Sequence, residues 1–269
     1  MTTTEILAIG NELLIGDVQD SNTAWLCRRI TGLGGHVARA TLIRDEPAVI
    51  GEALHAALGR GAAVLFTSGG LGPTHDDLTL AALAGALSRP LAESPAALEM
   101  VQATYTRLLR AGYVAHDRMT GERRKMALLP AGAEPVFNPV GAAPGVILRQ
   151  GAATIVCLPG VPAELKGIFE ESLGPLLKAL YGEGYYNELV IQTDCGDESL
   201  LAPVVNRLAA RYPQVYVKSR AKAYGPQVRL KITLGARGAG RAAVEALLQE
   251  AAGELTDALA GIGVAILAG

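Results

Sequence analysis

Short apolar runs alternate with segments of helical periodicity along the first part of the chain. Residues 5–10, 36–44 and 62–68 have the length and apolar content of buried strands, whereas residues 21–35 and 46–61 repeat their apolar positions with the period of a helix. This β-α-β-α-β order predicts a parallel sheet with right-handed crossovers and helices on both faces. We therefore expect an α/β fold.

The pattern becomes less regular in the middle of the chain. Residues 95–112 and 121–129 are predicted as helices, and the stretch after them combines loop and strand. Residues 152–160 form another apolar run and are predicted as a buried strand. The segment 162–182 is predicted as one long helix that carries an internal Gly-Pro.

The last part of the chain predicts a second unit. A Gly/Tyr-rich stretch at 181–187 is expected to be a linker, and a β-α-β-β-α order follows it, with helices at 198–211 and 241–259. This order is typical of a small α+β domain. We therefore divide the chain into domains at residues 1–182 and 186–269.

Composition narrows the class of protein. Of the 269 residues, 50% are hydrophobic, enough to fill a sizeable core, and the formal net charge of -2 gives no reason to expect a nucleic-acid partner. The N-terminus lacks the basic start and apolar core of a signal peptide, and no stretch approaches the about 20 apolar residues that span a bilayer. Three cysteines without a CxxC pair suit a reducing compartment. We therefore expect a cytoplasmic protein with no membrane partner.

The most informative stretch is SGGLGPTHDDLT, which follows a predicted strand directly. Its glycines and proline predict a sharp turn with exposed amide N–H groups, and the helix expected after Thr74 adds the positive end of its dipole. Such a turn at the carboxyl end of a strand can bind an anion, most often phosphate. The alternative is a tight connection in which Thr74 and Asp77 form a capping box. The phosphate-binding candidates are Gly69, Gly70, Gly72, Pro73 and Thr74.

Two adjacent aspartates, Asp76 and Asp77, follow these glycines. Their charges suit a helix N-terminus, but bare carboxylates beside a phosphate would repel it. A divalent cation such as Mg²⁺ resolves the conflict, because it commonly bridges carboxylates and substrate phosphates. Both aspartates are therefore our candidates for metal binding and for catalysis.

Three more loops are expected at the same edge of the sheet. The turn after the first strand carries Glu12, a further catalytic candidate, and then Asp20 and Asn22, which either bind substrate or cap the next helix. NPVGAAPG is a binding loop or a stiff turn, and LPGVPAEL repeats the strand–glycine–helix arrangement. The substrate-binding candidates in these two motifs are Asn138, Gly141, Pro144, Gly145, Pro159, Gly160 and Glu164.

The C-terminal part carries a basic run and a short glycine motif. Five basic residues without an acid among them predict a basic face, which is either a solvated sheet surface or a lid or dimer contact. Gly-Ala-Arg-Gly at Gly235–Gly238 matches the GxxG of KH domains, but it follows a strand, whereas a KH clamp needs a helical context. We therefore expect no nucleic-acid binding. The basic residues are Lys218, Arg220, Lys222, Arg229 and Lys231.

Four motifs in order resemble a known family. AIGNELLIGDVQDSN, SGGLGPTHDDLT, NPVGAAPG and LPGVPAEL are similar to the N-terminal domain of the competence/damage-inducible CinA proteins, within the MoaB/Mog-like molybdopterin-binding superfamily. The resemblance covers about residues 4–180, and the segment after Tyr186 is similar to the small KH-like domain of CinA-type proteins. It implies a three-layer α/β/α fold with a mostly parallel sheet, followed by a small α+β KH-like domain.

For the CinA branch, the resemblance implies metal-dependent hydrolysis of the pyrophosphate bond of ADP-ribose, helped by potassium. The competing interpretation is a protein that binds molybdopterin or a pterin nucleotide without hydrolysing it, because one fold hosts both functions. We expect a homodimer in either case.

The chain departs from the family pattern at three places. Molybdenum-cofactor relatives tend to carry Arg-Asp where this chain has Asp76 and Asp77, which argues against carrying over their adenylyl chemistry. Many relatives have a second proline where this chain has Val161. Since the sequence ends at Gly269, we do not expect the deamidase domain of full-length CinA proteins.

Overall fold

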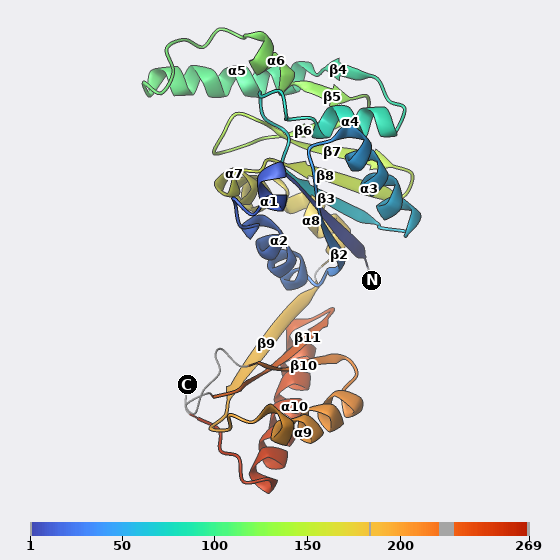
Figure 1. Cartoon of the computed structure of the whole chain (residues 1–269), viewed down its shortest axis with the longest axis vertical. Helices are drawn as coiled ribbons and strands as arrows, with labels where there is room; N and C mark the ends of the chain where they lie inside the picture. The colour runs from blue at the N-terminus through green and yellow to red at the C-terminus, as the bar shows by residue number, and fades with distance from the viewer. Residues whose placement is uncertain (1, 183, 221–228, 268–269) are drawn as a thin grey trace. The chain divides into compact units, whose positions relative to one another are not determined.

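The computed structural model describes residues 2–182, 184–220 and 229–267 and divides into two compact units (Figure 1). The first unit holds the chain up to Ile30 and Gly35–Tyr181, and the second holds Thr31–Gly34 and the chain from Gly182 onward. Each unit has its own cluster of buried apolar side chains. Within the described ranges, every helix is too short or too polar to cross a lipid bilayer.

A six-stranded sheet forms the middle of the first unit. Its strands are β1 (Thr3–Ile9), β2 (His36–Ile43), β3 (Val64–Ser68), β6 (Glu134–Val136), β7 (Gly145–Gln150) and β8 (Ala153–Leu158). They lie in the order β2-β1-β3-β8-β7-β6, with β2, β1, β3 and β8 parallel, β7 antiparallel to β8, and β6 antiparallel to β7. The predicted mostly parallel sheet is confirmed.

Helices cover both faces of this sheet (Figure 1). They are α1 (Asn11–Leu14), α2 (Ser21–Gly32), α3 (Pro47–Gly59), α4 (Thr79–Ala86), α7 (Pro162–Gly167), the π-helical turn η1 (Ile168–Ser172) and α8 (Gly174–Tyr181). On one face, Leu7 of β1 and Leu54 of α3 belong to one buried cluster. On the other, Phe66 of β3 lies 5.9 Å from Phe169 of η1, and Phe169 meets Trp25 of α2 edge-on at 5.2 Å between ring centroids. The three-layer arrangement is therefore confirmed.

Between α4 and β6 the chain forms an outer segment, residues 91–130, beside the sheet (Figure 1). It comprises β4 (Leu91–Glu93), α5 (Pro95–Arg110), α6 (Gly121–Lys125) and β5 (Leu128–Pro130), with β4 antiparallel to β5. Ser94 starts α5, because its hydroxyl accepts a hydrogen bond from the Ala97 amide at 3.3 Å and Pro95 suits the first helical turn. Val101 and Met126 join the buried cluster of the sheet, which fixes the outer segment to it.

Two expectations for residues 162–187 are wrong. The chain there forms α7, η1 and α8 in place of one helix, and the break falls beside Pro175, whose ring and missing N–H interrupt a helical ladder. The expected linker is in part a strand, because β9 begins at Tyr185.

The second unit is a three-stranded antiparallel sheet with two helices. Its elements are β9 (Tyr185–Gln192), α9 (Glu198–Arg211), β10 (Val215–Arg220), β11 (Lys231–Gly238) and α10 (Arg241–Gly261), with the strand order β10-β11-β9. Leu208 of α9, Ile232 of β11 and Leu255 of α10 share one core. Asp197 caps α9, since its carboxylate accepts a hydrogen bond from the Ser199 amide at 2.8 Å. This arrangement confirms the predicted α+β order.

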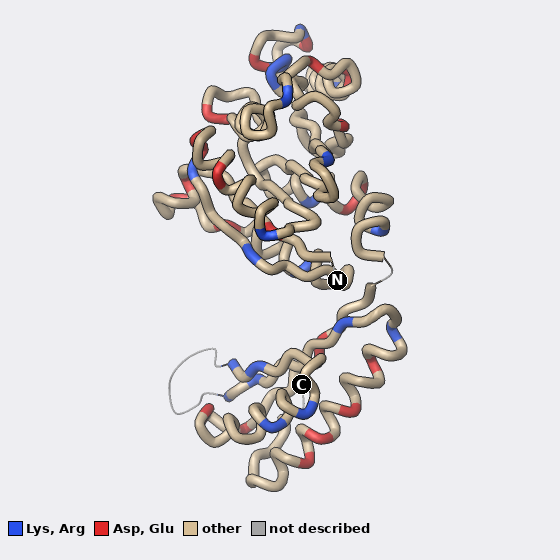
Figure 2. The backbone as a smooth tube through the Cα atoms, turned by 90° about the vertical axis from the view of Figure 1, so that its right-hand side faces the viewer, with Lys and Arg blue, Asp and Glu red and all other residues tan. Residues whose placement is uncertain are grey.

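The predicted basic face lies in part on this second sheet. Lys218 and Arg220 are exposed on β10, and Lys231 of β11 is paired with Arg220. Figure 2 marks the Lys and Arg positions in blue and the Asp and Glu positions in red along the backbone. Lys222 lies outside the described residues. Gly235–Gly238 lies within β11, so it forms no loop of the kind that a KH clamp uses.

An ion pair between a buried carboxylate and a partly exposed arginine in the first unit gives a test of this fold. Glu5 of β1 is 3% exposed, and Arg60 donates to both of its carboxylate oxygens, at 2.8 and 2.6 Å. Arg60→Ala leaves the carboxylate buried and unpaired, so we expect the free energy of unfolding to fall by about 3 kcal/mol in urea denaturation. The double variant Glu5→Gln/Arg60→Ala should lose less. The half-exposed pair Arg29–Glu170 is the control, and Arg29→Ala should cost about 1 kcal/mol or less. Equal losses of unfolding free energy in Arg60→Ala and Arg29→Ala would contradict this expectation.

Candidate functional site

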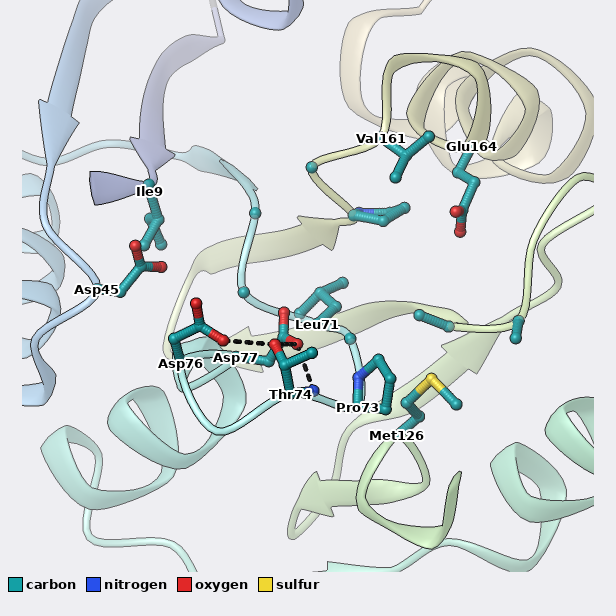
Figure 3. A pocket seen from close by; sticks show the side chains of 18 of the residues that line it. Ile9, Asp45, Leu71, Pro73, Thr74, Asp76, Asp77, Met126, Val161 and Glu164 are labelled. Carbon is teal, nitrogen blue, oxygen red and sulfur yellow. Dashed lines mark hydrogen bonds between the residues drawn. The ribbon is translucent and has the colours of Figure 1, made fainter. Parts of the chain in front are cut away.

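The carboxyl ends of the parallel strands meet at one edge of the sheet, and a pocket of about 400 Å³ opens there (Figure 3). This is the position at which open α/β sheets bind ligands. Since β7 runs antiparallel to β8, the loop that precedes β7 reaches the same edge. The predicted site residues that line the pocket are Glu12, Gly69, Gly70, Gly72, Pro73, Thr74, Asp76, Asp77, Pro159, Gly160 and Glu164.

The turn after β3 needs glycine at two successive positions. Gly69 has a φ of +112°, and a Cβ placed on it would lie 2.1 Å from the carbonyl oxygen of Ile9. Gly70 has a φ of +69°, and a Cβ there would lie 2.2 Å from Oγ1 of Thr79. Both the left-handed backbone and the lack of space exclude a side chain, so the sequence can make this turn only with glycines.

Helix α4 begins at Thr79, not directly after Thr74, so the expectation of a helix dipole at Thr74 is wrong. The Thr79 amide donates to the Gly70 carbonyl at 3.2 Å, and its hydroxyl donates to the Gly69 carbonyl at 2.9 Å. The start of the helix therefore holds the glycine turn from behind. Among the hydrogen bonds of the described residues, none is donated by the backbone amides of Gly70, Leu71 and Gly72, all of which line the pocket. These amides can bind an anion.

Thr74, Asp76 and Asp77 form a compact turn beside these amides (Figure 3). Asp77 accepts hydrogen bonds from the Thr74 amide at 2.8 Å and from the Thr74 hydroxyl at 2.6 Å, which is half of the capping box considered as an alternative. The Thr74 hydroxyl also contacts Asp76, and this hydrogen bond lowers the pKa of Asp76. Lys125 of α6 donates to the Thr74 carbonyl. Asp77 thus has a structural role in the turn, and Asp76 remains ionised at neutral pH.

Asp45 adds a carboxylate to this side of the pocket. It follows β2, and its side chain accepts a hydrogen bond from the Asn11 amide at 2.7 Å. Burial raises its pKa, and the negative charges of Glu12 and Asp76 add to the effect. In the part of the chain that the structure describes, no three His, Cys, Asp or Glu side chains are grouped so that they could hold a metal ion. A divalent ion at this place would therefore need oxygen ligands from the bound molecule.

Asp20 and Asn22 support the site from outside the pocket. Asp20 accepts a hydrogen bond from the Thr23 amide at 2.9 Å at the start of α2, as expected for a cap. Asn22 is buried, and its amide donates to the Ser68 hydroxyl at 3.0 Å and to the Gly160 carbonyl at 2.7 Å. It therefore ties α2 to the ends of β3 and β8, and neither residue is among those that line the pocket.

Asn138 organises the loop before β7. Its Oδ1 accepts from the amides of Val140 and Gly141 at 3.0 and 2.8 Å, and its Nδ2 donates to the Ala143 carbonyl at 2.8 Å and to Oε2 of Glu164 at 2.6 Å. Burial raises the pKa of Glu164, and the hydrogen bond from Asn138 opposes that rise. Of the predicted residues in this loop, Asn138, Gly141, Pro144 and Gly145 do not line the pocket, and all of them except Gly141 are buried. The loop reaches the pocket through Ala142 and Ala143, and Asn138 contacts the lining residue Glu164.

Several lining residues were missed in the sequence, among them Asp45, Tyr105, Met126 and Val161. Asp45 could have been found, because it directly follows a predicted parallel strand. Tyr105 and Met126 come from the outer segment, where Arg123 stacks over the Tyr105 ring at 3.7 Å from its centroid. No motif marks them, since the sheet pattern does not extend into that segment.

Comparison with known proteins assigns the chain to a family. Residues 5–179 match the family model described as "Probable molybdopterin binding domain". The chain belongs to this family. A protein of Aeropyrum pernix is 42% identical over 245 residues, which cover 90% of this chain and 88% of that protein. Protein TK1472 of Thermococcus kodakarensis is 38% identical over 228 residues, covering 85% and 89%.

A similar solved structure is that of the protein CinA of Thermoplasma acidophilum, whose function is described as unknown. It is 31% identical and aligns with a TM-score of 0.58 over 65% of this chain and 98% of its own. The resemblance to CinA-type N-terminal domains and to the molybdopterin-binding family is therefore confirmed. The family match spans the pocket and ends before Gly182, where the main part of the second unit begins.

The raised pKa of Asp45 predicts a pH-dependent stability. A carboxyl group whose pKa is raised by folding contributes stability at low pH, and this contribution is lost as the pH rises through the raised pKa. Asp45→Asn keeps an acceptor for the Asn11 amide but cannot ionise. We expect the melting temperature of the variant, relative to wild type, to be higher at about pH 8 than at about pH 4. The same difference at both pH values would contradict the cause assigned here.

Proposed function

We propose that the chain binds a phosphorylated pterin of the molybdopterin type in this pocket. The observation that supports this proposal is that the pocket lining combines backbone N–H groups with aromatic and apolar side chains. Its lining combines the backbone of Gly70, Leu71 and Gly72 with the side chains of Tyr105, Met126 and Val161. Membership of the probable molybdopterin binding family supports the same ligand class.

These two kinds of lining suit the two parts of such a ligand. Backbone amides of a glycine turn bind phosphate oxygens, and a divalent cation such as Mg²⁺ would offset the carboxylates that surround this turn. Aromatic and apolar side chains exclude water around a flat heterocycle, as in most small-molecule sites. The volume of about 400 Å³ is within the range of pockets that hold ligands of this size.

A binding experiment tests this proposal. In the presence of Mg²⁺, 6-hydroxymethylpterin phosphate should raise the melting temperature, and at about 100 times its Kd it should add about 2.7 kcal/mol to the free energy of unfolding. Unphosphorylated 6-hydroxymethylpterin should bind at least roughly tenfold more weakly, because it lacks the group that the amides hold. ADP-ribose and AMP serve as comparison ligands in the same titration. Stabilisation by ADP-ribose and not by the pterin phosphate would reject the proposal in favour of the second candidate.

The second candidate is hydrolysis of the pyrophosphate bond of ADP-ribose. The observation that favours it is the gathering of carboxylates beside the glycine turn, namely Glu12, Asp45, Asp76 and Asp77. A diphosphate next to them needs a divalent cation, and Mg²⁺ held by Asp76 and the substrate's own oxygens would suit the place. The ion would supply charge neutralisation while water attacks phosphorus, giving AMP and ribose 5-phosphate. Glu12 would hold the water, and potassium stays an expectation of the family resemblance.

Substitution of the aspartates tests the second candidate. Asp76→Asn removes the ionised carboxylate without changing its size. If Asp76 holds the metal, Mg²⁺-dependent turnover of ADP-ribose should fall by on the order of a hundredfold, equivalent to about 2.7 kcal/mol. Asp77→Asn keeps an acceptor for the Thr74 amide, so a fall in its turnover would indicate a metal role of Asp77 and not the loss of the turn. Wild-type turnover in both single variants and in the double variant would rule out the metal role of the pair.

A further inference from the structure

The pocket carries an unusual set of charges. Five of its lining residues are carboxylates, and among the described residues that line it none is Lys or Arg. Four of the five lie around the glycine turn. Glu164 is different, because it projects from α7 on the other side of the pocket, next to Val161 (Figure 3). Val161 is one of the side chains that the proposed function places around the ring of the ligand.

Glu164 is held in place from two directions. Asn138 donates to its Oε2 at 2.6 Å, and Asn138 is itself 3% exposed and saturated with backbone hydrogen bonds. The backbone of Gly141 lies directly beneath the carboxylate, since a Cβ on Gly141 would be 2.1 Å from Cδ of Glu164. The conformation of Glu164 is therefore fixed before any ligand binds.

Among the described residues, Asn138 is the one donor to the carboxylate of Glu164. This carboxylate is half buried, and within the described part of the chain no cation forms an ion pair with it and no donor reaches its Oε1. A half-buried carboxylate of this kind is stabilised by N–H groups that a ligand brings. The amide from Asn138 fills one acceptor position on Oε2, which leaves that oxygen and Oε1 able to accept from two neighbouring N–H groups.

We propose that Glu164 determines specificity by accepting hydrogen bonds from the 2-amino-4-oxopyrimidine edge of the ligand's ring. This edge carries two adjacent donors, the ring N–H and the 2-amino group, and a carboxylate pairs with both at once. The inference rests on the proposed function, because it assumes that a pterin ring occupies this side of the pocket. It adds the class of ring selected there, to the exclusion of rings without the paired donors.

Rings without the 2-amino group fit this carboxylate badly. A 2-oxo ring, such as a lumazine, places a carbonyl oxygen against the carboxylate, and adenine offers a donor beside an acceptor. In both, Glu164 loses a hydrogen bond or meets a repelling oxygen. We expect the wild-type protein to prefer the 2-amino ring by roughly 10- to 100-fold, as for hydrogen bonds to a charged group.

The test uses one pair of ligands that differ only at this position. 6-Hydroxymethylpterin phosphate and 6-hydroxymethyllumazine phosphate are titrated calorimetrically against the full chain. In Glu164→Gln, the new side-chain carbonyl accepts from Asn138 and its NH₂ group then faces the ligand. The preference for the pterin should therefore disappear or reverse toward the lumazine. Glu171→Gln, an equal charge change on an exposed residue of η1, should keep the wild-type preference.

A second variant tests position without changing charge. Gly141→Ala puts a methyl group where the Glu164 carboxylate lies, so the carboxylate must move while remaining ionised. We expect this variant to lose most of the preference, with an unchanged affinity for inorganic phosphate at the glycine turn. Melting curves of each variant establish that it is folded.

The outcomes separate the two proposals. If wild type binds neither ring phosphate, the proposed function and this inference are both wrong. If wild type binds both equally, or if Glu164→Gln and Gly141→Ala keep the wild-type ratio, pterin binding stands and the role of Glu164 is wrong.

Discussion

The site depends on how closely three strand ends approach one another at Gly69. The Gly69 amide donates to the Leu158 carbonyl of β8 at 3.0 Å, and its missing side chain leaves room for the Ile9 carbonyl of β1. Gly160 closes against the same residue, since a Cβ on it would lie 3.5 Å from Cα of Gly69. A side chain at Gly69 would push β1 and β3 apart, and the loops that form the pocket would separate with them.

Two buried asparagines convert this strand geometry into fixed loops. Asn22 joins α2 to β3 and to the loop after β8, and Asn138 joins four groups of its own loop and of α7. An asparagine side chain suits this role because it carries both donors and an acceptor on one rigid amide. In the sequence, both residues looked like ligand contacts. An Asn after a strand has the same pattern whether it faces a ligand or the backbone, and only the packing decides between them.

The parts of the structure that follow a repeating rule could be predicted. Parallel strands bring their carboxyl ends together, so the loops of Glu12, Gly69 and Gly160 were expected at one edge, and they line one pocket. Tyr105 and Met126 could not be predicted to join them, because their segment reaches the pocket by tertiary packing alone. The start of α4 was also misplaced, since Thr74 and Asp77 satisfy each other outside the helix while Thr79 begins it. Local capping patterns do not show which of two candidate residues begins the helix, because packing in the core decides it.

Two parts of the pocket lining differ in how strongly the structure constrains their sequence. The glycine turn is locked by close backbone approaches and tolerates almost no change, whereas Tyr105 and Met126 of the pocket lining come from one continuous stretch, residues 91–130, attached to the sheet by apolar contacts. Apolar contacts tolerate substitution if volume is kept. Divergence within that stretch can therefore reshape one part of the pocket lining while the glycine turn stays intact. Under the proposed function, the fold would combine an invariant turn for the phosphate group with a variable surface for the rest of the ligand.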